Sequence, residues 1–203
     1  MRKVDPAKHA EKRQEILEAA ERCFTRSGFH RATTSAICAE ANISPGHLFH
    51  YFDSKESMIA AITRARLDDA MVRSERVMEG ADPFGSFVKG IEDVLLAKGE
   101  MKNALLLDML AEARHNPIMA RIVQENSHQG RAVVAAFLHK GQQDGRVDAN
   151  LDPELAAAIL ISVIDGLQCI AIRDPEIDKN ATGRLLLTML LRLLAPPAAA
   201  DNR

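Results

Sequence analysis

The most constraining feature of this sequence is the stretch TTSAICAEANISPGHLFHYFDSK, residues 33–55, which predicts two short helices separated by a tight turn. Thr33 suits the N-cap of the first helix, because its hydroxyl can accept a bond from an otherwise unpaired amide. Asn42 stands where that helix must end, and asparagine tolerates the left-handed conformation of a sharp stop. Ser44 and Pro45 then restart a helix as N-cap and first helical residue.

The spacing of the apolar residues gives the second helix one inward face. Leu48 and Phe52 are four residues apart and anchor that face, whereas His47, His50 and Tyr51 point elsewhere. A helix this short is not stable alone, so neighbouring elements must hold it and leave its polar face available. This layout predicts a helix-turn-helix, whose second helix enters the major groove of DNA.

The same stretch resembles the signature of the tetracycline-repressor (TetR) family of bacterial transcription regulators. The resemblance covers about residues 10–60, and its lead-in consists of Ala20, Phe24, Gly28, Phe29 and the pair Thr33-Thr34. Three positions depart from the family pattern: Phe49 stands where the family usually has Tyr, Asn42 where it has Gly, and Cys38 where it has Ala. The first departure is expected to remove one phosphate contact, and the other two to leave packing unchanged.

The motif and the resemblance together predict a DNA-binding site. Phosphate contacts fix register and base-edge contacts specify sequence. The residues expected at phosphates are Thr33, Thr34, Ser44, Tyr51 and Lys55, and those expected near base edges or sugars are Pro45, Gly46, His47, Leu48 and His50. The spacing of His47 and His50 also fits metal ligands, but that face offers no Cys, Asp or Glu, so we expect no metal there.

Lys55 is predicted in the first turn of the next helix, where the helix dipole disfavours a cation. This placement indicates a nearby anion, and a DNA phosphate would serve. The alternative is a solvated lysine paired with Glu56 or Asp53.

Charge and cysteine content permit this function without proving it. The net charge is −2, but residues 1–55 carry nine Lys and Arg against seven Asp and Glu, so this part is +2 and the remainder −4. The three cysteines lie far apart without a CxxC pair, which favours a reducing compartment over a disulfide framework or zinc site.

The N-terminus lacks the apolar core of a signal peptide, and we expect a cytoplasmic protein. The basic residues 1–8 are either a phosphate-touching arm or a frayed tail.

The periodicity predicts an all-α fold of about nine helices. An N-terminal three-helix DNA-binding domain is expected over residues 9–53, with its motif at about 33–52. A larger helical ligand-binding and dimerisation domain follows over 54–195, opened by a long connecting helix at about 54–79, and 196–203 form a flexible tail.

The last two helices, within residues 153–195, are apolar nearly all round, so they are buried on every side. A membrane span is disfavoured, because Asp165 and Gln168 interrupt the first run and Arg192 the second. We expect a homodimer closed by a four-helix bundle. The predicted interface residues are Leu155, Ile159, Val163, Gly166, Ile170, Leu187, Leu190, Leu191 and Leu194.

A small-molecule site is predicted less sharply. Candidate contact residues are Asp108, Met109, Glu112, His139, Asp165 and Gln168, each of which either lines a pocket or faces solvent or the dimer partner. Seven of the eight methionines lie beyond residue 57, and they indicate either an adaptable pocket or ordinary core filling. No GxSxG, HExxH or glycine-rich phosphate loop occurs, so neither an enzyme nor a cofactor is expected.

The sequence therefore predicts a ligand-responsive regulator, a repressor released from a near-palindromic double-stranded DNA operator by a small-molecule effector. The alternative is a helical interaction or dimerisation module with a vestigial helix-turn-helix.

Overall fold

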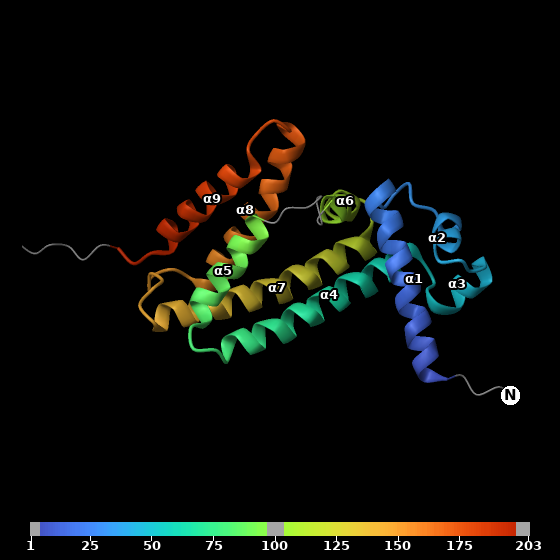
Figure 1. Ribbon diagram of the computed structural model, residues 1–203, viewed down its shortest axis with the longest axis horizontal. Helices are drawn as coiled ribbons and strands as arrows, with labels where there is room; N and C mark the ends of the chain where they lie inside the picture. Colours follow the sequence, from blue (N-terminus) through green and yellow to red (C-terminus); the bar gives the residue numbers. More distant parts are fainter. Residues whose placement is uncertain (1–4, 97–103, 198–203) are drawn as a thin grey trace, which may run out of the picture. The chain divides into compact units, whose positions relative to one another are not determined.

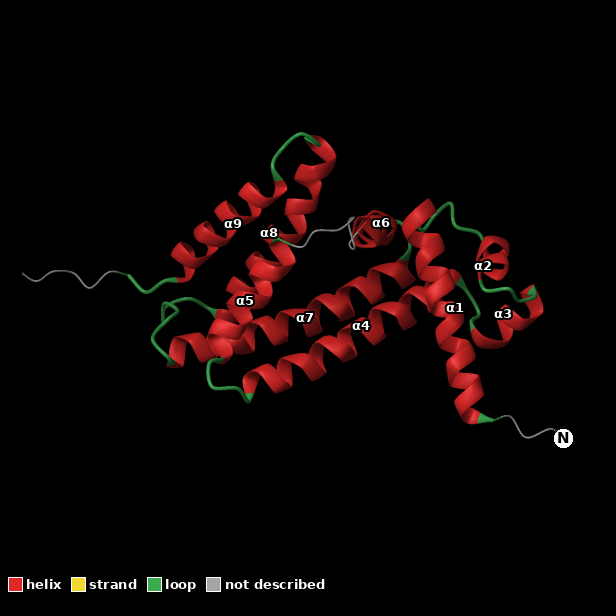
Figure 2. Ribbon diagram, viewed as in Figure 1, coloured by secondary structure: helices red, strands yellow, loops and turns green. Residues whose placement is uncertain are grey.

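A computed structural model describes residues 5–96 and 104–197, and these residues form nine α-helices and no strand (Figures 1 and 2). The all-α prediction is thereby confirmed. The helices are α1 Pro6–Ser27, α2 Thr34–Glu40, α3 Pro45–Tyr51, α4 Lys55–Met78, α5 Pro83–Leu95, α6 Ala104–Ala113, α7 Pro117–Gln143, α8 Pro153–Arg173 and α9 Lys179–Leu194. The predicted tail lies mostly outside the described residues, as do residues 1–4 of the N-terminal arm, whereas residues 6–8 of that arm belong to α1.

Short polar side chains set where most of these helices begin. Asp5, Asp82 and Asp152 each accept a hydrogen bond from a first-turn amide and are each followed by proline, which fits the first helical position. At the start of α4, Ser54 and Ser57 each accept the other's backbone amide, at 3.1 and 3.2 Å. Local sequence thus fixes the helix starts independently of packing.

The described residues form two compact units. The first combines residues up to 68 with the segment that ends at 126, and its core contains Ile16, Phe24, Ile37, Leu48 and Met58. This unit is larger than the DNA-binding domain predicted over residues 9–53, because α6 and the beginning of α7 pack within it. The assignment of DNA binding to residues 9–53, and of ligand binding and dimerisation to residues 54–195, stays a prediction.

The second unit combines residues from 69 to 96 with those from 127 onward. Its core contains Phe84, Leu138, Leu160, Leu190 and Leu194. The prediction that Leu190 and Leu194 line a dimer interface is therefore wrong: they are only 5% and 4% exposed, because α9 turns them toward its own chain. Among the described residues, no helix combines the length and apolar character needed to cross a membrane.

Helices α5 and α9 approach closely at Gly183. A Cβ atom there would lie 2.8 Å from the backbone oxygen of Leu95, which cannot move aside as a flexible side chain could. We expect Gly183→Ala to lower the free energy of unfolding by about 1–3 kcal/mol through overpacking. Gly90→Ala is the matched control, since nothing lies within 4 Å of a Cβ at this helical glycine, and gains of about 0.5–1 kcal/mol are usual there. Thermal unfolding of both variants at one protein concentration measures the difference; equal shifts would contradict the close approach.

Candidate nucleic-acid interface

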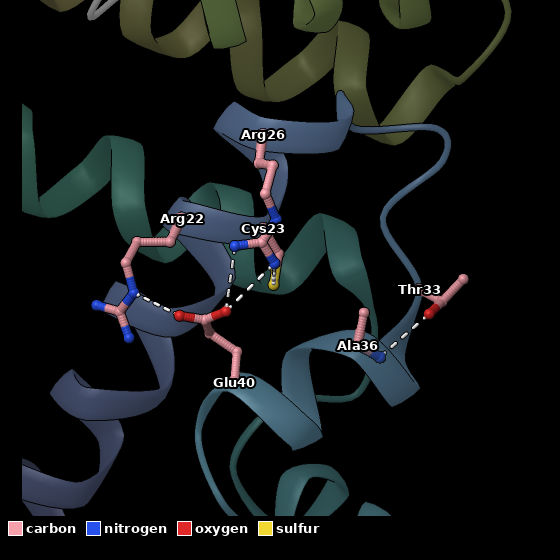
Figure 3. Close-up of polar contacts among 6 residues, drawn as sticks. All are labelled: Arg22, Cys23, Arg26, Thr33, Ala36 and Glu40. Carbon is pink, nitrogen blue, oxygen red and sulfur yellow. Dashed lines mark hydrogen bonds and ion pairs between the residues drawn. The ribbon is translucent and has the colours of Figure 1, made fainter.

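Helices α2 and α3 form the predicted helix-turn-helix, with the caps that the sequence predicts. Thr33 Oγ1 accepts the amide of Ala36 at 3.1 Å (Figure 3), and Ser44 Oγ accepts the amide of His47 at 3.3 Å. Asn42 adopts φ = 51°, the left-handed conformation expected at the sharp stop. The amide of Ile43 returns to Cys38 O at 2.9 Å and closes the turn. Backbone bonds and side-chain caps therefore fix the direction of α3.

Helix α3 has one buried face and one exposed face. Leu48 is 0% exposed and belongs to the first unit's core, whereas Pro45, Gly46, His47 and His50 are exposed. The prediction that Leu48 lies near base edges is therefore wrong, because its side chain points away from the face on which the other predicted residues lie. The remaining predicted base-edge residues share one solvent-facing surface, as a reading helix requires.

Phe49 is a residue of this face that the site prediction missed. Its ring is 51% exposed on α3 although it is large and apolar. The helical phase gave no clear signal for it, since Phe49 lies three residues before the inward-facing Phe52 and therefore at the edge of the buried face.

An ion cluster clamps α2 to α1. The Glu40 carboxylate receives Arg22 Nε at 2.9 Å and both terminal nitrogens of Arg26, at 3.2 and 3.3 Å (Figure 3). These hydrogen bonds, from Arg22 first and then Arg26, hold the pKa of Glu40 below its ordinary value. Arg26 also lies 3.7 Å from the sulfur of Cys23, but burial raises the pKa of that thiol and keeps it protonated.

The clamp predicts a pH-dependent contribution to stability. Because the pKa of Glu40 is lowered in the folded state, its contribution is fully present above the unfolded value and is lost as pH falls through the folded value. We expect Glu40→Gln to lower the melting temperature at neutral pH, with the difference from wild type shrinking as pH falls below about 4.3 and disappearing only below the lowered folded-state pKa. Glu18→Gln is the control, since that carboxylate accepts from the uncharged amide of Gln14. A deficit that persists at low pH would contradict the ionic account.

Lys55 lies at the start of α4 but points at the backbone of the turn between α1 and α2. Its ammonium donates to the carbonyls of Phe29, His30 and Ala32 at 2.9, 3.3 and 3.0 Å, and lies 4.7 Å from the centre of the Phe29 ring. An ammonium has three protons, and these three acceptors engage all of them. Carbonyl oxygens thus supply the negative partner that the sequence indicated; a phosphate contact stays a prediction and would require one of these bonds to open.

Comparison with known proteins decides the family. The model described as "Bacterial regulatory proteins, tetR family" matches residues 16–62, which span α2 and α3. A second, "BetI-type transcriptional repressor, C-terminal", matches residues 91–195. The chain belongs to the TetR family. It is a DNA-binding transcriptional regulator.

Individual TetR-family proteins match this chain in sequence or fold over most of its length. The HTH-type transcriptional regulator UidR of Escherichia coli K12 is 30% identical over 155 residues, which cover 76% of this chain and 79% of UidR. The structure of Salmonella enterica GusR is also 30% identical, covers 90% of this chain and 96% of its own, and superposes with a TM-score of 0.72. A TetR regulator from Haloarcula marismortui is 21% identical with a TM-score of 0.75 over 92% of this chain and 99% of its own, which shows a shared fold.

In this TetR-family chain, α6 also holds the turn between α1 and α2. Asp108 Oδ2 accepts the amide of Phe29 at 3.2 Å, and the Glu112 carboxylate lies 3.9 Å from the imidazole of His30. Gly28 makes room, because a Cβ there would lie 3.0 Å from Asp108 and its φ is 76°. Asp108 and Glu112, predicted as effector contacts, thus lie against the turn between α1 and α2, and their contact with an effector stays a prediction.

The predicted effector residues fall in two different units of the structure. Asp108, Met109 and Glu112 belong to the first unit, where Met109 is buried in the core, while His139 and Asp165 belong to the second. His139 is exposed, and Asp165 is half-buried, with burial raising the pKa of its carboxyl. The side chain of Gln168 lies outside the described part of the structure. The effector site stays a prediction.

Proposed function

We propose that this regulator is a repressor that binds a near-palindromic operator as a homodimer and leaves it when a small-molecule effector binds. One observation carries the proposal: the exposed face of α3, held by the Thr33 and Ser44 caps and by the clamp on α2, presents Pro45, Gly46 and His47 to solvent. A helix held in this way can enter the major groove with a defined orientation. A repressor that acts on a DNA operator would work in the cytoplasm.

A second copy of the chain accounts for the apolar faces left open on the last two helices. On α8 the exposed residues Leu155, Ile159 and Val163 follow one another at four-residue spacing, and nothing lies within 4 Å of a Cβ at Gly166. On α9 the exposed residues Leu185, Met189 and Leu193 repeat that spacing. Apolar faces of this kind favour association, and the two-fold dimer is the commonest closed assembly.

The turn between α1 and α2 supports a route from effector to DNA. It is held from one side by Lys55 of α4 and from another by Asp108 of α6, and it leads into the Thr33 cap of α2. An effector that displaced either helix would change the orientation of α2 and α3. The two half-sites of an operator are separated by a helical repeat of about 34–36 Å. A small displacement of one DNA-binding domain relative to the other would therefore detach one of them from its half-site.

The alternative, an interaction module with a vestigial helix-turn-helix, is not favoured. The family match and the N-caps of α2 and α3 are those of an intact DNA-binding helix-turn-helix. Titration of a labelled duplex from the DNA flanking the protein's own gene, against a scrambled duplex, tests the proposal. We expect the flanking duplex to bind more tightly, by roughly a thousandfold or more for a specific site. Equal affinity for both would contradict operator recognition. Melting-temperature shifts with a metabolite panel then test the effector, since a ligand of the native state stabilises it.

A further inference from the structure

Four aromatic rings from two helices gather beside the reading face. The imidazole of His9, on α1, stacks on the ring of Tyr51 with 4.6 Å between centroids and 30° between planes. His50 meets Tyr51 edge-on at 5.3 Å and His9 at 5.9 Å, and His47 lies 5.4 Å from Tyr51. We call His9, His47, His50 and Tyr51 the ring cluster. Tyr51 therefore supports three imidazoles, of which one comes from outside the helix-turn-helix.

The ring cluster borders solvent on the side where α3 is exposed. His47 and His50 are exposed, and His9 and Tyr51 are half-buried against each other. Stacking fixes the His9 ring in position at a small entropic cost, since a packed ring has few rotamers left to lose on binding. His9 thus extends the surface of α3 toward the beginning of α1.

We propose that His9 belongs to the DNA-contact surface, and that binding of DNA by the ring cluster is coupled to proton uptake. The inference rests on the proposed function, because it needs α3 to face DNA. It adds a DNA-contacting residue on α1 and a proton requirement that the helix-turn-helix motif does not contain.

The charges around the cluster leave the imidazoles few anionic partners. On α1, Asp5 caps the helix through the amide of Ala7 at 3.1 Å, Lys12 pairs with Glu15 at 2.7 Å, and the Arg13 guanidinium lies 4.9 Å over the Phe52 ring. The remaining charged groups close in sequence are Lys8 and Glu11 on α1 and Asp53 after α3. A phosphate backbone would provide the missing negative charge.

Histidine is the side chain whose charge changes between about pH 5 and 8. A nearby phosphate favours the charged form, so DNA binding and protonation assist each other. Affinity must then rise as pH falls, by about tenfold per pH unit for each whole proton taken up. A metal is a poor alternative, because among the residues that the structure describes no three His, Cys, Asp or Glu side chains, those of the ring cluster included, are placed so that they could hold a metal ion.

The test is a set of titrations of the flanking-gene duplex and of a scrambled duplex at about pH 6 and about pH 8, at one salt concentration and with chelator present. We expect wild type to bind both duplexes more tightly at the lower pH, by on the order of tenfold or more. His9→Gln, which keeps a polar side chain but cannot be protonated, should lose part of this gain. His128→Gln, at an exposed histidine of α7, is the matched control and should keep it.

The outcomes separate the inference from the proposed function. A wild-type affinity for DNA that is the same at both pH values would contradict the proposed proton uptake. A His9→Gln variant with the full wild-type pH response, and an unchanged melting temperature to show it is folded, would remove His9 from the surface. Loss of binding in chelator would indicate a metal site and overturn the inference. Failure of wild type to bind either duplex at both pH values would contradict the proposed function itself, and the inference with it.

Discussion

Aspartate at Ile159 or Met189 is expected to convert the proposed dimer into a folded monomer with a large loss of operator affinity. Both side chains lie on the open apolar faces, 54% exposed on α8 and 58% exposed on α9. A carboxylate there would remain solvated in the monomer but would have to be desolvated in an interface, where an unpaired charge is strongly unfavourable. Losing the second DNA-binding domain should weaken operator binding by about a hundredfold to ten-thousandfold.

Light scattering at several protein concentrations, together with the operator titration, measures this effect. Val94→Asp is the matched control, because Val94 is a comparably exposed apolar residue that belongs to α5 and not to α8 or α9. Leu190→Asp is unsuitable, since Leu190 lies in the core of its own chain and the change would unfold the second unit. A clean dimer for both Ile159→Asp and Met189→Asp would contradict the assignment of the interface to α8 and α9.

Lys55→Met is expected to weaken binding to every duplex by on the order of tenfold to a hundredfold, because three carbonyls of the turn lose a charged donor. Methionine keeps an apolar stem over the Phe29 ring, so the change isolates the ammonium. Asp108→Ala removes the second support of the same turn, the bond to the Phe29 amide, and should act in the same direction.

The salt dependence separates this positioning role from a phosphate contact. If Lys55 only positions the turn, the logarithmic slope of affinity against salt is unchanged, whereas a lost phosphate contact lowers it by about one. Lys89→Met, at an exposed lysine of α5 that pairs with Glu92 at 2.8 Å, controls for the general loss of positive charge. A slope reduced by one in Lys55→Met alone would return Lys55 to the phosphate contacts.

The helix-turn-helix could be predicted because its determinants are local. Thr33, Asn42 and Ser44 act on backbone groups within a few residues of themselves, so the caps and the stop are readable from spacing. The error at Leu48 was also local: its four-residue spacing from Phe52 already placed it inward.

Contacts between distant segments could not be read in this way. Lys55 binds carbonyls 23 to 26 residues earlier, and Asp108 binds an amide 79 residues earlier. Helix α9 is leucine-rich on all sides, so its periodicity could not distinguish the core residue Leu190 from the exposed neighbour Met189. The packing of α9 against α5, permitted by Gly183, and against α8 fixes which face is open.

The central claim, that the exposed face of α3 reads DNA sequence, is tested most directly at His47. We expect His47→Ala to weaken binding to the operator by about 1–3 kcal/mol while leaving affinity for a scrambled duplex nearly intact, since base contacts discriminate and phosphate contacts do not. Both titrations are made at one salt concentration and at about pH 8, the upper end of the range in which histidine side chains generally change charge, so that the loss of a cation does not mask the loss of a base contact. A selective loss on the operator supports α3 as the specificity element; an equal loss on both duplexes, or none, would contradict it.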